Sequence, residues 1–118
     1  MVGPAMSLPT IGVYIPTAGR DSLRRTLHSI SQQRLIPGDE VLVIGDGPVP
    51  SAEALCKEFG EPFRYLEGPH TSDWGHSQAN MALHNGHMSA DLLVAQDDDD
   101  IFLPRAFEAI RAVGTKNP

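Results

Sequence analysis

Residues 40–48 read EVLVIGDGP, an almost wholly apolar run that stops at a turn of glycine, aspartate and proline. An apolar run without polar alternation is typical of a strand that is buried on both faces, as the strands of parallel sheets are. Glycine and proline then interrupt regular structure, because they suit tight turns. The stretch therefore predicts a buried parallel strand over 40–44, followed by a sharp turn over 45–48 that carries Asp46.

Three more apolar runs predict three more strands, which we expect over 11–15, 63–66 and 91–96. The first of them should stop at Pro16, because proline has no N–H to donate to a sheet ladder.

Between the strands, apolar residues recur at helical spacing. The expected helices start at Asp21 or Ser22, at Ser51 as N-cap, at His76 (continuing to Met88) and near Pro104. Regular alternation of strand and helix predicts an α/β fold, here a mostly parallel four-stranded sheet with helices on both faces. In such open sheets, ligands bind beyond the carboxyl ends of the strands.

Composition limits the classes of partner. The 118 residues include 9 Lys and Arg against 15 Asp and Glu, a net charge of -6, which argues against a nucleic-acid partner. The apolar runs are far shorter than the roughly 20 residues of a transmembrane helix.

Cys56 is the only cysteine, so no intramolecular disulfide can form, and we expect a buried structural thiol and a cytoplasmic location. Residues 1–9 should be a flexible lead-in to one domain over 10–118.

The run Asp97 to Asp100 follows the last expected strand directly. Adjacent carboxylates stay ionised only when a cation or full solvation compensates their repulsion. A D-x-D pair offers oxygen ligands to Mg²⁺ or Mn²⁺, whereas a solvated acidic turn before a helix is the plainer reading, and the run alone leaves both open. Since side chains alternate along an extended chain, Asp97 and Asp99 should point one way and Asp98 and Asp100 the other.

Several other site classes fit poorly. An EF-hand needs glycine at its sixth loop position, where this chain has Phe102. Neither a P-loop nor a dinucleotide fingerprint is present; residues 16–20 after the first strand read PTAGR. A phosphoacceptor signalling domain would place its acidic pair after the first strand rather than after the fourth.

Four segments resemble family 2 glycosyltransferases of the GT-A fold in their order and spacing. They are VYIPTAGRDSLRRTLHSISQQ (13–33), EVLVIGDGP (40–48), GHSQANMAL (75–83) and LLVAQDDDDIFLP (92–104). PTAGR and DDDDIFLP are the most specific of these pieces. The resemblance implies an enzyme that binds a nucleotide-diphosphate sugar, usually a UDP-sugar, with Mn²⁺ or Mg²⁺, and transfers the sugar with inversion to an acceptor hydroxyl.

The resemblance also suggests which side chains surround the donor. Pro16 and Thr17 would lie beside the base and ribose, and Asp46 would hydrogen-bond the base. By its charge Arg20 could reach a phosphate, although a charge at a helix start is more often solvated. His76 or Gln78 would replace the basic contact to the diphosphate that the family often has.

For the acidic run, the resemblance implies that Asp99 is the direct metal ligand, with Asp97 as its D-x-D partner. Asp97 and Asp98 would face the ribose and the nearby phosphate.

The chain departs from the family pattern in two places and in length. Gly45 stands where the family commonly has an acidic residue, and Ala79 stands where it often has arginine. Family members are longer, and their second half supplies the acceptor site and the catalytic base, so no base is assigned here. We expect the donor-binding half alone, with the strand over 91–96 as an apolar edge that a missing C-terminal half, a partner chain or a second copy covers. A non-catalytic nucleotide-sugar or metal-binding module completed by a partner chain is the alternative.

Overall fold

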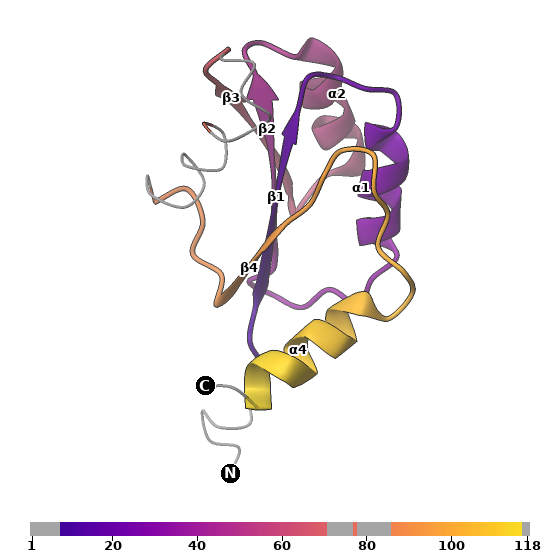
Figure 1. The fold of residues 1–118 in the computed structure, drawn as a ribbon, viewed down its shortest axis with the longest axis vertical. Helices are drawn as coiled ribbons and strands as arrows, with labels where there is room; N and C mark the ends of the chain where they lie inside the picture. Colours follow the sequence, from indigo (N-terminus) through magenta and orange to yellow (C-terminus); the bar gives the residue numbers. More distant parts are fainter. Residues whose placement is uncertain (1–7, 71–76, 78–85, 117–118) are drawn as a thin grey trace.

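A computed structural model describes residues 8–70, 77 and 86–116 of the protein. Within these residues it has one four-stranded sheet and three helices (Figure 1). The elements are β1 (Ile11–Thr17), α1 (Leu23–Ser31), β2 (Glu40–Asp46), α2 (Pro50–Phe59), β3 (Phe63–Gly68), β4 (Leu92–Ala95) and α4 (Ala106–Lys116).

The sheet has the strand order β3-β2-β1-β4, and each neighbouring pair is parallel. The predicted α/β fold with a parallel four-stranded sheet is therefore confirmed. Because all four strands run the same way, their carboxyl ends lie along one edge. Thr17, at the end of β1, is in register with Gly45 of β2, and Gly45 is in register with Glu67 of β3.

One face of the sheet carries the main core. Alternate side chains of β1 and β2, such as Val13 and Val43, pack with the apolar stripe of α1 that contains Leu27 and Ile30. Helices α1 and α2 lie side by side on this face (Figure 1). Burial and the nearby Glu53 raise the pKa of the Cys56 thiol in α2 to about 11, so it stays protonated at neutral pH, as a structural thiol should.

The other face has a smaller cluster in which Leu42 and Ile44 of β2 pack with Tyr14, Leu66 and Met88. The helix expected over 76–88 would cover this face. It lies mostly outside the described residues, and its last three residues, 86–88, are not helical.

The prediction that β1 stops before Pro16 is wrong, because the strand continues to Thr17. The N–H of Gln96 donates to the carbonyl oxygen of Tyr14, so the backbone groups of Tyr14, and of Pro16 two residues later, face β4. Pairing with β4 has already ended at Tyr14. The missing N–H of Pro16 therefore costs no ladder hydrogen bond.

Two other boundaries also differ from expectation. β2 runs on through Gly45 to Asp46, since both residues still pair with β3. Asp46 thus ends a strand, and the prediction that it lies in a sharp turn over 45–48 after the strand is wrong. Helix α2 begins at Pro50 after Val49, and not with Ser51 as N-cap, because proline suits the first helical position.

Edge strand β4 is partly exposed, as expected. A groove of about 540 Å³ runs between it and α4, lined mainly by apolar side chains such as Leu93 and Val113, which are 39% and 61% exposed. In the part of the chain that the structure describes, no helix has the length and apolar character needed to cross a bilayer.

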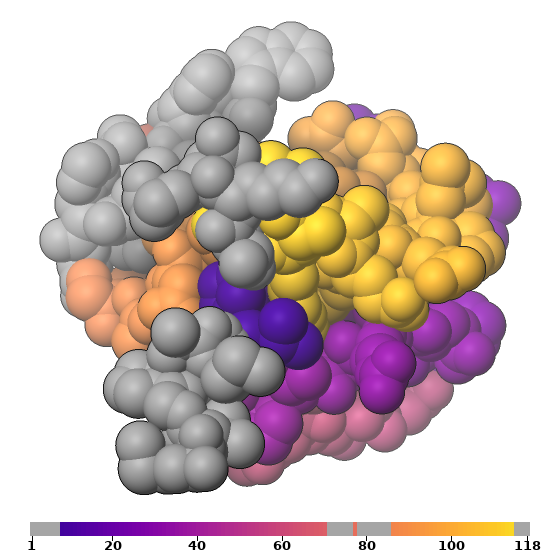
Figure 2. All heavy atoms as spheres, turned by 90° about the horizontal axis from the view of Figure 1, so that it is seen from below, coloured from indigo at the N-terminus to yellow at the C-terminus, as the bar shows by residue number. Residues whose placement is uncertain are grey.

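Helix α4 is anchored near the amino ends of the strands by a buried ion pair between Arg111 and Asp39. Arg111 also donates to the carbonyl oxygens of Pro9 and Arg34, and Asp39 accepts from the N–H of Ile11. Seen from below, the yellow atoms of α4 lie against the indigo atoms that lead into β1 (Figure 2). One buried network therefore joins α4, β1 and the segment before β2.

We expect Arg111→Ala to lower the free energy of unfolding by about 3–5 kcal/mol, because the Asp39 carboxylate would stay buried without its partner. Urea denaturation measures this change. Arg105→Ala removes an exposed arginine just before the same helix, whose ion pair is with Glu108 only three residues away, and should leave stability nearly unchanged. Equal stability of the two variants would contradict the anchoring described here.

Candidate functional site

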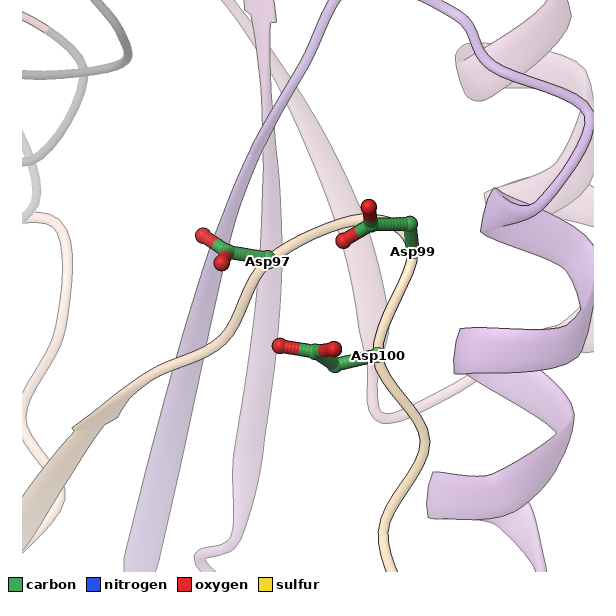
Figure 3. Close-up of side chains that lie close together, drawn as sticks. All are labelled: Asp97, Asp99 and Asp100. Carbon is green, nitrogen blue, oxygen red and sulfur yellow. The ribbon is translucent and has the colours of Figure 1, made fainter.

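The loop that follows β4 gathers three of the four aspartates. The strand ends at Ala95, and a turn then brings the N–H of Asp100 to 3.4 Å from the carbonyl oxygen of Asp97. One carboxylate oxygen each from Asp97, Asp99 and Asp100 lies within 4.8 Å of the others, and all three residues are exposed. Figure 3 shows Asp99 and Asp100 directed back across the turn toward the stretch that carries Asp97. Three hard oxygen ligands so placed suit Mg²⁺ or Mn²⁺.

The expected strict alternation of the four side chains is therefore wrong. Asp97 and Asp99 do lie together, but Asp100 joins them instead of pointing away with Asp98. The cause is the turn over residues 98 and 99, since alternation holds only while the chain stays extended.

Asp98 is the buried member of the run, with 7% of its surface exposed. Its Oδ2 accepts a 2.7 Å hydrogen bond from the Thr17 hydroxyl, and its Oδ1 lies 3.6 Å from Nε of Arg20. The Thr17 oxygen in turn accepts from the N–H of Gly19 at 3.0 Å. Asp98 and Thr17 are thus engaged with each other at the tip of β1 and hold the acidic loop against it.

Helix α1 and its N-cap residue Ser22 hold the same loop through hydroxyl groups. Ser22 donates to the carbonyl oxygen of Asp98 at 2.9 Å, and Thr26 donates to that of Asp100 at 2.6 Å. Ser29 accepts from the N–H of Phe102 at 3.0 Å. Sequence reasoning missed these three residues. The available signal was their helical spacing beside the apolar stripe of α1, which places small hydroxyl groups along one line of the helix.

The end of β2 forms the second part of the site. The Tyr65 hydroxyl accepts from the N–H of Val49 at 2.9 Å and so organises the turn after Asp46. A Cβ on Gly45 would lie 2.5 Å from that hydroxyl, which explains why glycine stands there instead of an acidic residue. Nδ1 of His70, to which the sequence assigned no function, lies 3.4 Å from Oδ1 of Asp46.

The two parts lie on the same edge of the sheet. Asp46 ends β2, Thr17 ends the adjacent β1, and Asp98 is bonded to Thr17 from the far side. Asp46 and the acidic loop therefore lie on either side of the tip of β1. Pro16 lies between them in β1, in register with Ile44. Gln78 lies outside the described residues.

Arg20 is a cation that faces the acidic loop. Its side chain is 60% exposed, and Nη1 lies 3.1 Å from Oδ2 of Asp99. It thereby partly offsets the repulsion among the neighbouring carboxylates.

The parallel sheet and its helices match solved structures of GT-A glycosyltransferases. The structure of residues 1–349 of TarS from S. aureus matches with a TM-score of 0.76 and 17% identity, over 87% of this chain and 31% of that chain. A second TarS structure matches with a TM-score of 0.75 and 17% identity, over 87% of this chain and 19% of that one.

The mannosyltransferase PcManGT from Pyrobaculum calidifontis, solved in complex with GDP-Man and Mn²⁺, matches with a TM-score of 0.69 and 22% identity, over 97% of this chain and 34% of that chain. This chain thus spans a third or less of the TarS structures and about a third of PcManGT. At these identities the likeness shows a shared fold. No curated protein matches the sequence.

The family follows from the sequence itself. Residues 12–113 match the profile of glycosyl transferase family 2, which is most of the chain. The chain belongs to glycosyl transferase family 2, as the resemblance of its four motifs implied.

We expect Thr17→Val to lower the free energy of unfolding by about 1–3 kcal/mol, because Asp98 would lose its hydrogen-bond donor while still buried. Thr17→Ser keeps the hydroxyl and should stay close to the wild type. Urea denaturation of both variants measures the difference. If valine and serine are equally stable, the hydrogen bond to Asp98 does not anchor the loop.

Proposed function

We propose that this chain is the donor-binding part of a family 2 glycosyltransferase, which binds a nucleotide-diphosphate sugar together with Mn²⁺ or Mg²⁺. The observation that carries the proposal is the convergence of Asp97, Asp99 and Asp100 at the carboxyl edge of the sheet. Ligands of open α/β sheets bind at this edge. The Mn²⁺ and GDP-Man named with PcManGT support the same class of ligand.

The residues of the site have different functions in binding. Asp99 and Asp97 hold the cation, which supplies positive charge beside the diphosphate when it is bound. Asp98 and Thr17 keep the acidic loop in place, since their side chains are bonded to each other. Asp46, on the far side of β1, accepts a hydrogen bond from the base, which we propose to be uracil. Pro16 lies between these two parts and contacts the ribose.

We further propose that the enzyme inverts the anomeric centre when it transfers the sugar to an acceptor hydroxyl. No described residue is assigned as the base that deprotonates this hydroxyl. The chain covers about a third of the lengths of TarS residues 1–349 and PcManGT, so the acceptor site is proposed to lie outside it.

A second function is favoured by the apolar groove between β4 and α4. In this case the chain is a nucleotide-sugar or metal-binding module that a partner chain completes. Transfer assays on the protein together with the structure that covers this groove, and not on the isolated chain, separate the two functions, because only a transferase then releases UDP from a UDP-sugar.

We expect Asp99→Asn to weaken the Mn²⁺-dependent binding of UDP by roughly 100-fold, since it removes the charge of the direct metal ligand. Isothermal calorimetry with UDP and Mn²⁺ measures the affinity, and circular dichroism shows whether the fold is retained. Glu108→Gln, a change at a half-buried position in α4, is the matched control and should bind normally. Equal affinity in the wild type and Asp99→Asn would refute the metal assignment.

We expect Asp46→Ala to weaken UDP binding by about tenfold while leaving the affinity for Mn²⁺ alone unchanged, because the base and the cation bind on opposite sides of β1. The same titrations with GDP test base selectivity, since the variant should lose its preference for UDP. An unchanged ratio of UDP to GDP affinity would exclude Asp46 as the base-reading residue.

A further inference from the structure

We propose that Arg20 is a movable counter-ion of the acidic loop, which competes with the divalent cation for Asp99 and moves to the diphosphate when the donor binds. The inference rests on the proposed function and adds the order of events at the same site. It predicts that removing Arg20 has opposite effects on the binding of metal alone and on the binding of nucleotide with metal.

The guanidinium of Arg20 contacts two aspartates of different character. Nη1 lies 3.1 Å from Oδ2 of Asp99, whose side chain is 48% exposed. Nε lies 3.6 Å from Oδ1 of Asp98, whose side chain is only 9% exposed. The Asp98 carboxylate is held by Thr17 and stays in place. One end of the arginine thus faces a fixed carboxylate and the other an exposed carboxylate that is a candidate metal ligand.

A divalent cation bound among Asp97, Asp99 and Asp100 would take the Asp99 carboxylate as a ligand, and Arg20 already contacts this carboxylate. The Arg20 guanidinium and a cation bound to Asp99 beside it also repel each other, since both are positive. An ion pair between exposed side chains is weak, so the cation can displace it. Arg20 therefore lowers the affinity of the loop for metal alone. A bound cation in turn weakens the ion pair between Arg20 and Asp99.

The surroundings of Arg20 allow its side chain to turn toward a diphosphate. The side chain is 60% exposed, and Gly19 before it has a φ of 97°, in the left-handed region that favours glycine. The Gly19 N–H is fixed to Thr17, so the backbone of the turn stays at the tip of β1. Mg²⁺ and Mn²⁺ usually keep phosphate oxygens among their ligands. In our proposal the diphosphate therefore lies close to the displaced Arg20 side chain. The planar guanidinium can donate two parallel hydrogen bonds to phosphate oxygens.

A purely structural function of Arg20 makes a different prediction. If the arginine only tethered the acidic loop to β1, its removal would loosen Asp99 and weaken the binding of metal and of nucleotide alike. The signs of the two effects therefore distinguish a movable counter-ion from a tether.

The experiment compares Arg20→Gln with the wild type in two titrations, Mn²⁺ alone followed by electron paramagnetic resonance, and UDP at saturating Mn²⁺ followed by calorimetry. We expect Mn²⁺ alone to bind about three- to fivefold more tightly to the variant, the scale of one exposed ion pair. UDP should bind about tenfold more weakly, because a charged hydrogen-bond donor to phosphate is lost.

Two further variants complete the experiment. Arg25→Gln removes an exposed positive charge of α1 that lines a second groove, between α1 and α2, and should change neither affinity. Arg20→Lys keeps the charge without the planar fork, so Mn²⁺ alone should bind as in the wild type while UDP binds more weakly.

Unchanged or weaker Mn²⁺ binding to Arg20→Gln would overturn the competition, and unchanged UDP binding would overturn the transfer to the diphosphate. Failure of the proposed function looks different, since wild type and Asp99→Asn would then bind Mn²⁺ equally.

Discussion

The hydrogen bond from Thr17 to the buried carboxylate of Asp98 links the fold of this protein to its site. Thr17 ends β1, which lies between β2 and β4. The hydrogen bond to Thr17 therefore attaches the acidic loop to the interior of the sheet. A buried carboxylate is costly unless it is bonded, and this cost makes the position of Asp98 definite. The acidic loop is therefore held against the strand ends, although three of its four aspartates are exposed.

The four aspartates are consequently not equivalent. Asp98 serves the structure of the loop, whereas Asp97, Asp99 and Asp100 present their oxygens to the outside. Arg20 contacts one member of each kind, and in our proposal this double contact makes the loop responsive to both cation and diphosphate. Such a loop can remain ordered while its net charge changes, because its anchor is separate from its ligands.

The opposite end of the sheet is held by different chemistry. There the buried pair of Asp39 and Arg111 joins α4 to the residues before β1 and β2. Between the two anchored ends, β4 keeps an apolar edge and shares a groove with α4. In our proposal, further structure packs against this groove.

The sequence by itself determined the family, the alternation of strands and helices, and the strand end at which the acidic loop lies, because hydrophobic period and motif spacing are local properties of the chain. Only the tertiary structure decided that β1 passes through Pro16, that Asp100 joins Asp97 and Asp99, and that Asp98 is buried. The position of Asp100 depends on the turn over residues 98 and 99. The other two outcomes depend on neighbours distant in sequence, namely the early end of β4 and the hydroxyl of Thr17. No local pattern carries that information, because the contacts form only when strands 81 residues apart are laid side by side.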